Sequence, residues 1–235
     1  MAAADVGKAV EKEGGYAPAG TRITLRLPDD FHHHCRDGLR TAAVLLHASR
    51  RFGRCLVMPN LKPPVATTAM ALDYRRHVLK SVPKESANAA FQPVMTLYLT
   101  DRTTPEEIQK AASAEGGYPT IVGCKYYPAG ATTNSDSGVT DVRNCYPALK
   151  ELERQRMMLC IHSEVTHDCV DIFDREPVFI EEVIKPLVSD FPDLKITMEH
   201  ISTKEAVDYV ANVAPSTVKA SITCHHLLYN RNRKK

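Results

Sequence analysis

The sequence contains no tryptophan and only six phenylalanines among its 235 residues. It also lacks a long apolar run, since none approaches the roughly 18 consecutive apolar residues that a membrane-spanning helix needs. Charge of one sign does not dominate: 30 basic and 28 acidic residues leave a formal net charge of +2. This balance gives no reason to expect binding to nucleic acid or to a membrane surface, but it is compatible with a small anionic substrate.

Cysteine is present, but not in a pattern that predicts disulfides. There are seven cysteines, an odd number at wide spacings, and no Cys-x-x-Cys pair occurs. This usage is typical of a reducing compartment. The first twenty residues lack the apolar core of a secretory signal and contain no Arg, which argues against a transit peptide. We therefore expect a loose lead-in over residues 1–20, one domain over residues 21–235, and a cytoplasmic protein.

Short apolar runs alternate with longer segments of helical periodicity through the rest of the chain. Strands are expected at 23–27, 54–58, 91–98, 120–126, 158–162, 195–198 and 218–223. Helices are expected at 39–52, 68–82, from 105 onward, and at 142–155, 178–189 and 203–212. No tight hairpin signal joins consecutive strands, so the pattern predicts a parallel sheet covered by helices.

Two architectures fit this alternation, an open doubly wound sheet and a closed barrel. A glycine-rich phosphate loop after the first strand would favour the open sheet, and the sequence has none. Residue types that carry chemistry recur instead at the ends of several strands, as in a barrel active site. We therefore predict an α/β fold, a (β/α)8 barrel of the TIM type that lacks its last strand.

Several of these strand ends carry residues that can bind metal ions. His32 and His34 lie two positions apart in an extended segment, so both point to one side, about 6–7 Å apart, while His33 faces away. His162 and His200 each follow an apolar run. Any one of them could be a structural histidine at the rim of the barrel. Together they predict a two-metal hydrolytic centre.

Lys125 ends a further apolar run. An ammonium group has no lone pair and cannot bind a metal ion. A lysine that has reacted with carbon dioxide carries a carbamate, whose two oxygens can bridge two cations. The simpler alternative is a lysine that buries its stem and extends its ammonium group to solvent.

The order of these residues resembles the amidohydrolase superfamily, and the runs between them narrow the resemblance to dihydroorotases of the compact single-function type. The matching runs lie between Pro28 and Asn232 and include PDDFHHHCRDG, VMPNLKPP, TLYLTD, KYYPAGATTNSDSGVT, EHISTKEA and HLLYNRN. The resemblance implies a hydrolase of pyrimidine biosynthesis that reversibly cyclises N-carbamoyl-L-aspartate to L-dihydroorotate. It also implies a homodimer.

The resemblance further implies a pair of zinc ions bridged by carboxylated Lys125 and by a hydroxide. One ion is expected on His32 and His34, and the other on His162 and His200. The residues expected to bind the substrate are Arg36 and Asn60, which suit its carboxylate, with Thr132 and Thr133 in a mobile lid.

The sequence departs from the family pattern at two places. The family's catalytic Asp follows an eighth strand, and we expect this chain, which ends after the seventh predicted strand, to lack it and to have little activity. His33 stands where the family more often has an apolar residue.

A non-catalytic dihydroorotase-like binding protein is the main alternative. A cysteine hydrolase is disfavoured because Cys124 should face away from Lys125, and the Cys224-His225-His226 run lacks a partner pair for a zinc site.

Overall fold

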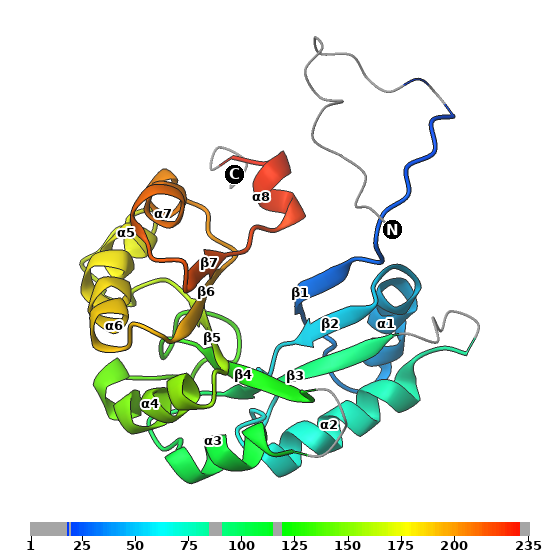
Figure 1. The fold of residues 1–235 in the computed structure, drawn as a ribbon, viewed down its shortest axis with the longest axis horizontal. Helices are drawn as coiled ribbons and strands as arrows, with labels where there is room; N and C mark the ends of the chain where they lie inside the picture. The colour runs from blue at the N-terminus through cyan, green and yellow to red at the C-terminus, as the bar shows by residue number, and fades with distance from the viewer. Residues whose placement is uncertain (1–17, 19, 85–90, 115–118, 231–235) are drawn as a thin grey trace, which may run out of the picture.

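Seven parallel strands form one sheet in the computed structural model, which describes residues 18, 20–84, 91–114 and 119–230. The strands follow one another in chain order, from β1 to β7, so each pairs with its neighbour in sequence. The sheet curls, the helices cover its outer face, and β1 and β7 form its two edges (Figure 1). The fold is therefore an open, partial (β/α)8 barrel, as predicted.

The elements alternate as the sequence indicated. The strands are β1 Asp29–His33, β2 Arg54–Val57, β3 Gln92–Tyr98, β4 Ile121–Tyr126, β5 Met158–His162, β6 Lys195–Glu199 and β7 Val218–Ala220. The α-helices are α1 Leu39–Arg51, α2 Thr68–Ser81, α3 Pro105–Ala112, α4 Tyr146–Arg154, α5 Arg175–Phe179, α6 Lys185–Asp190, α7 Lys204–Asp208 and α8 Cys224–Leu228. A 3-10 segment, η1 Val142–Cys145, precedes α4, and π-helical segments η2 Ile180–Ile184 and η3 Tyr209–Val213 continue α5 and α7.

Three helices begin at a threonine whose hydroxyl accepts a hydrogen bond from the first turn. Thr67 does so for α2, Thr104 for α3 and Thr203 for α7. Each such cap contributes about 1 kcal/mol to helix stability. Pro105 follows Thr104 as the first residue of α3, where its missing N–H costs nothing. These caps therefore fix the residues at which the three helices begin.

Alternation along the strands sorts side chains between the two faces of the curled sheet. Outward residues such as Val57, Leu97 and Leu159 belong to the large core that the helices cover. Inward residues Leu56 and Cys160 belong to a separate, smaller apolar cluster inside the barrel. The carboxyl ends of the same inner face carry the polar residues described below.

The first predicted strand is wrong. Ile23 and Leu25 form no strand and are 73% and 78% exposed. The strand that pairs with β2 begins instead at Asp29, opposite Arg54. Alternating apolar residues at 23–27 imitate a strand, but a strand also needs a hydrogen-bonded neighbour, and β2 is already paired with β1 on that side.

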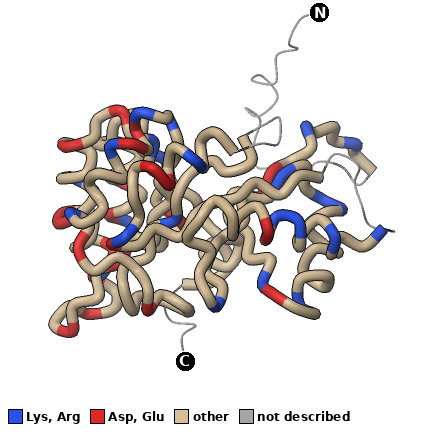
Figure 2. The backbone as a smooth tube through the Cα atoms, turned by 90° about the horizontal axis from the view of Figure 1, so that it is seen from below, with Lys and Arg blue, Asp and Glu red and all other residues tan. Residues whose placement is uncertain are grey.

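Other predictions differ mainly in their boundaries. The segments expected as single helices at 142–155, 178–189 and 203–212 contain 3-10 or π-helical turns. The expected lead-in falls largely outside the described residues. None of the described helices is long and apolar enough to cross a membrane. Acidic and basic residues are interspersed along the backbone, as Figure 2 shows.

Candidate metal centre

Four histidine rings converge at the carboxyl ends of β1, β5 and β6. The centroid of the His32 ring lies 5.0 Å from that of His34 and 5.1 Å from that of His200. The rings of His162 and His200 are 4.8 Å apart. Residues separated by up to 168 positions thus form one continuous cluster. The structure brings together all four histidines that the sequence singled out.

Hydrogen bonds fix how two of these rings are oriented. Nδ1 of His34 lies 2.9 Å from Oδ1 of Asn60, whose own amide nitrogen donates to the Thr133 carbonyl. Nδ1 of His32 lies 2.8 Å from Oε2 of Glu199. Since both partners are oxygens that accept, each Nδ1 carries the proton and each Nε2 presents a lone pair.

The two Nε2 atoms of His32 and His34 face each other at 3.2 Å. Two lone pairs at this distance repel unless a cation or a proton lies between them. Ligand nitrogens on one tetrahedral zinc ion lie about 3.3 Å apart, given Zn–N bonds of roughly 2.0–2.1 Å. The pair therefore has the separation and the tautomers that a shared metal ion requires.

Burial lowers the pKa of two imidazoles of the cluster, those of His34 and His200. It lowers the pKa of His34 to about 3, and the neighbouring charges of His32, Arg36 and Lys125 act in the same direction. Burial and the charge of Lys125 also lower the pKa of His200 far below its ordinary value. At neutral pH both rings are free bases with lone pairs available to a metal ion.

Backbone geometry aims His200 into the cluster. Its φ angle is 45°, in the left-handed region that costs a non-glycine residue about 1–3 kcal/mol. Its N–H donates to the Ser221 hydroxyl at 3.0 Å, which holds this conformation. Nε2 of His162 is buried without a hydrogen bond among the described residues, and a carboxylate oxygen of Glu164 lies 3.5 Å from it.

Lys125 is completely buried on the inner face of β4. Its Nζ atom has no hydrogen-bond partner in the part of the chain that the structure describes and lies 5.1 Å from the centre of the Tyr127 ring. Burial lowers its pKa to about 8, although the charge of Glu199 opposes this. The side chain therefore does not extend its ammonium group to solvent, and it lies near enough to His34 and His200 to influence the pKa of both.

Glu199 is a residue of the centre that sequence reasoning missed. It is 1% exposed, and besides His32 its Oε2 accepts from the Ser221 hydroxyl at 2.7 Å. Burial raises its pKa, but the hydrogen bond from His32 and the charge of Lys125 outweigh this, so the pKa lies below its ordinary value. Its place at the end of an apolar strand, directly before His200, was the available signal.

The predicted lid contacts the centre through Asn60. Besides the bond to the Thr133 carbonyl, the Asn60 carbonyl accepts from the Asn134 side chain at 2.9 Å. Tyr98 donates to the Asn134 carbonyl at 3.1 Å. Thr132 and Thr133 are themselves exposed. The lid therefore accepts one of the two N–H groups of the Asn60 amide, which was expected to donate to a substrate.

Arg36 follows β1 at the same end of the barrel and is exposed. No hydrogen bond or ion pair engages its guanidinium group among residues 18, 20–84, 91–114 and 119–230, and its backbone carbonyl accepts from Tyr74 at 2.7 Å.

Cys124 lies in the outer core, away from Lys125, as predicted. Cys224, His225 and His226 lie on α8.

Comparison with known proteins finds that dihydroorotases are similar in sequence to this chain. No protein-family model matches the chain. A dihydroorotase of Cupriavidus taiwanensis is 55% identical over 211 residues, and one of Leptothrix cholodnii is 54% identical over 212. Each match covers 90% of this chain and 59% of the relative. The chain thus spans just under three fifths of the length of these relatives, whose names do not favour the non-catalytic alternative.

Two solved structures that are similar to this chain are also dihydroorotases. Dihydroorotase from Campylobacter jejuni is 31% identical with a TM-score of 0.77, over 88% of this chain and 56% of that chain. Dihydroorotase from Saccharomyces cerevisiae in complex with 5-fluoroorotic acid is 31% identical with a TM-score of 0.78, over 90% and 60%. An L-hydantoinase from Arthrobacter aurescens, 15% identical with a TM-score of 0.64, shares the fold. Sequence and fold together show that this chain is a relative of the dihydroorotases.

Proposed function

We propose that this chain carries the metal centre of a zinc-dependent dihydroorotase, which interconverts N-carbamoyl-L-aspartate and L-dihydroorotate. The observation that carries the proposal is the pair of Nε2 lone pairs, on His32 and His34, 3.2 Å apart. In each ring, Nδ1 donates a hydrogen bond to an oxygen, which fixes the orientation of the ring. Metal-binding histidines typically have such a partner for the ring nitrogen that does not bind the metal ion.

The remaining ligands follow from the same cluster. His32 and His34 would hold one zinc ion, His162 and His200 the other, and carboxylated Lys125 would bridge them. When bound, the two ions polarise the reacting carbonyl and make hydroxide available near neutral pH. The arrangement also accounts for the buried Nζ of Lys125 and Nε2 of His162, neither of which has a hydrogen-bond partner among the described residues. A carbamate and Glu199 would each carry one negative charge, and together they would offset part of the positive charge of two divalent cations.

Burial prepares Lys125 for carboxylation. With a pKa of about 8, on the order of a tenth of the side chains are neutral amines at pH 7, far more than for an exposed lysine. The neutral amine adds to the carbon of carbon dioxide and loses one proton to solvent, which leaves a carbamate anion. The carbamate, unlike the ammonium group, offers oxygen lone pairs toward the histidines.

Arg36 and Asn60 are proposed to bind the carboxylate of the substrate. The guanidinium group of Arg36 can form two parallel hydrogen bonds with a carboxylate. Asn60 donates one of the two N–H groups of its amide to the Thr133 carbonyl, 3.1 Å away, and the other can donate to the substrate. The lid that carries Thr132 and Thr133 and the substrate would therefore share this amide, so substrate binding and lid position are coupled through one residue. A homodimer remains a prediction of the family resemblance.

Metal analysis of the purified full chain tests the proposal. We expect His32→Ala and His200→Ala to contain less zinc than the wild-type chain, because each removes a ligand of one of the two proposed zinc ions. His47→Ala is the matched control, because His47 is exposed on α1 and outside the cluster. Ring closure of N-carbamoyl-L-aspartate is then assayed with the zinc-loaded chain. Equal zinc content in all three variants would contradict the metal centre.

A further inference from the structure

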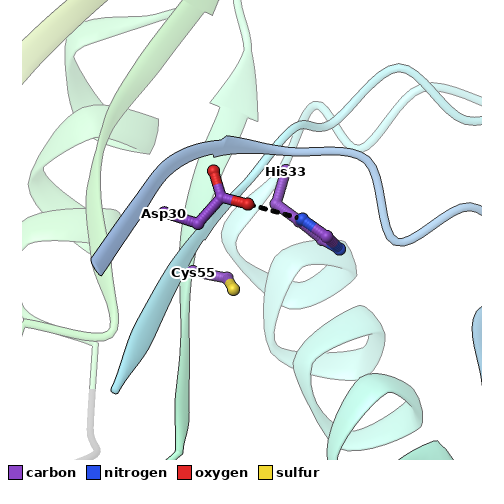
Figure 3. A group of neighbouring side chains, drawn as sticks. All are labelled: Asp30, His33 and Cys55. Carbon is purple, nitrogen blue, oxygen red and sulfur yellow. Dashed lines mark hydrogen bonds and ion pairs between the residues drawn. The ribbon is translucent and has the colours of Figure 1, made fainter. Parts of the chain in front are cut away.

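A second group of side chains that can bind a metal ion lies on the outer face of the sheet. Asp30 and His33 on β1 and Cys55 on β2 each offer one ligand atom, and these atoms all lie within 4.8 Å of one another. Figure 3 shows one ring nitrogen of His33 facing the carboxylate of Asp30, with Cys55 beside Asp30 on the neighbouring strand and the bond between His33 and Asp30 drawn. Nδ1 of His33 lies 2.8 Å from Oδ2 of Asp30.

An irregularity in strand pairing creates this group. Asp30 lies opposite Cys55 and His33 opposite Val57, with a shift of register between them. In a regular strand, residues three apart point to opposite faces. The shift places His33 on the face of Asp30 and Cys55, which a uniform β1 could not do.

The group is separate from the four-histidine centre. His32 and His34 turn into the barrel, whereas Cys55 belongs to the outer core beneath the helices. Cys55 is fully buried, and Nε2 of His33 is buried without a hydrogen-bond partner in the described part of the chain. Neither residue has a part in the proposed reaction.

We propose that Asp30, His33 and Cys55 form a structural site for a divalent cation of zinc type, bound through one oxygen, one nitrogen and one sulfur. This mixed donor set suits Zn²⁺, whereas Ca²⁺ and Mg²⁺ select oxygen ligands alone. A water molecule would complete a tetrahedral shell. The site joins β1, at the edge of the sheet, to β2.

Binding exchanges a proton for the metal ion. Burial raises the pKa of the Cys55 thiol, so the free thiol is protonated. As the metal–sulfur bond forms, the S–H bond breaks and the proton leaves to solvent. His33 would contribute a nitrogen atom and Asp30 a carboxylate oxygen.

The site would hold β1 in register. Because β1 pairs with β2 through an interrupted ladder, fewer hydrogen bonds fix its position than in a regular strand. The same strand carries His32 and His34 on its inner face. A metal ion on the outer face would therefore limit the movement of the inner ligands.

Cobalt spectroscopy on the full-length chain separates the two sites. Co²⁺ bound by a thiolate has an intense ultraviolet charge-transfer band, and the four-histidine centre contains no sulfur ligand. We expect this band in the wild-type chain, and its displacement by Zn²⁺. It should disappear in Cys55→Ala and in His33→Leu. Cys124→Ala, which removes an equally buried thiol elsewhere in the core, should keep it.

Far-UV circular dichroism confirms that each variant is folded before the comparison. His33→Leu serves as the second variant because it leaves every thiol in place and puts an apolar residue beside the core. Absence of the band from the wild-type chain at saturating Co²⁺ would overturn the proposal. So would a band of undiminished intensity in folded Cys55→Ala.

Discussion

His32 on β1 and Glu199 on β6 are joined by a contact of 2.8 Å between Nδ1 and Oε2, across 167 positions of the sequence. Glu199 thereby fixes the tautomer of a proposed ligand on a strand at the far side of the curled sheet. The same oxygen accepts from Ser221, just beyond β7. One buried carboxylate thus connects both edges of the open barrel at the proposed metal centre.

Glu199→Gln tests this connection. The amide keeps the volume and an oxygen acceptor for His32 but removes the negative charge, so the imidazole becomes a weaker ligand. We expect zinc affinity to fall about 10–100-fold, as for other partners of metal-binding histidines. Competition with a chromogenic chelator measures the affinity. Glu151→Gln, a largely buried carboxylate paired with Arg154 on α4, should leave it unchanged. Equal affinities in both variants would remove Glu199 from the centre.

Lys125 should make the stability of the metal-free chain depend on pH. Its pKa is 10.5 when unfolded and about 8 when folded, so between these values the unfolded chain binds more protons. Stability from this residue therefore rises with pH across that window. Below it, the buried ammonium destabilises the fold.

Lys125→Met should accordingly raise the melting temperature of the metal-free chain at neutral pH, by an amount that shrinks as the pH approaches 10.5. Differential scanning calorimetry in carbonate-free buffer with chelator measures the effect. Lys150→Met, at an exposed position on α4, is the control and should show no such trend. A lower melting temperature for Lys125→Met at neutral pH would contradict the argument.

Asn60→Asp separates metal binding from the control of the lid. The carboxylate still accepts from His34, so zinc content should be unchanged. It can no longer donate to the Thr133 carbonyl and repels it instead. We expect faster amide hydrogen exchange in residues 129–138. Asn144→Asp, an exposed change on η1, should leave exchange in that segment as it is. Unchanged exchange in Asn60→Asp would show that another contact holds the lid.

The five proposed metal ligands could be predicted because each stands at the carboxyl end of a strand, and parallel strands gather these ends at one rim. The contacts between these ligands and their partners could not. Glu199 joins His32 only because β1 and β6 curl toward one another, and His33 reaches the face of Asp30 and Cys55 only through an irregular register. Neither relationship has a local signal in the sequence.

The failure at 23–27 has the opposite cause. Ile23, Leu25 and Leu27 alternate as a strand should, yet all three are exposed. The local pattern of residues indicates which structure a segment can form, whereas pairing with a neighbouring strand decides whether a strand forms. β5, predicted at 158–162 and found there, is paired on both sides and buried over four of its five residues.

Gly123 on β4 offers a test of how closely the strands that carry the centre must approach. A Cβ atom at this position would lie 2.0 Å from the backbone carbonyl oxygen of Met158 on β5. Backbone cannot move aside as a flexible side chain can, so β4 and β5 would have to separate. Lys125 and His162 lie on these two strands, so the centre would be disturbed as well.

Gly123→Ala should therefore destabilise the chain by at least about 3 kcal/mol, the upper end of the usual range for overpacking. Urea unfolding followed by circular dichroism measures the loss. Gly53→Ala is the matched control, because its Cβ would meet only side-chain atoms of Leu27, the nearest at 3.2 Å, and Asp29. Those side chains can shift, so we expect a change below about 1 kcal/mol. If Gly123→Ala unfolded at the same urea concentration as Gly53→Ala, the close approach of β4 and β5 would be incorrect.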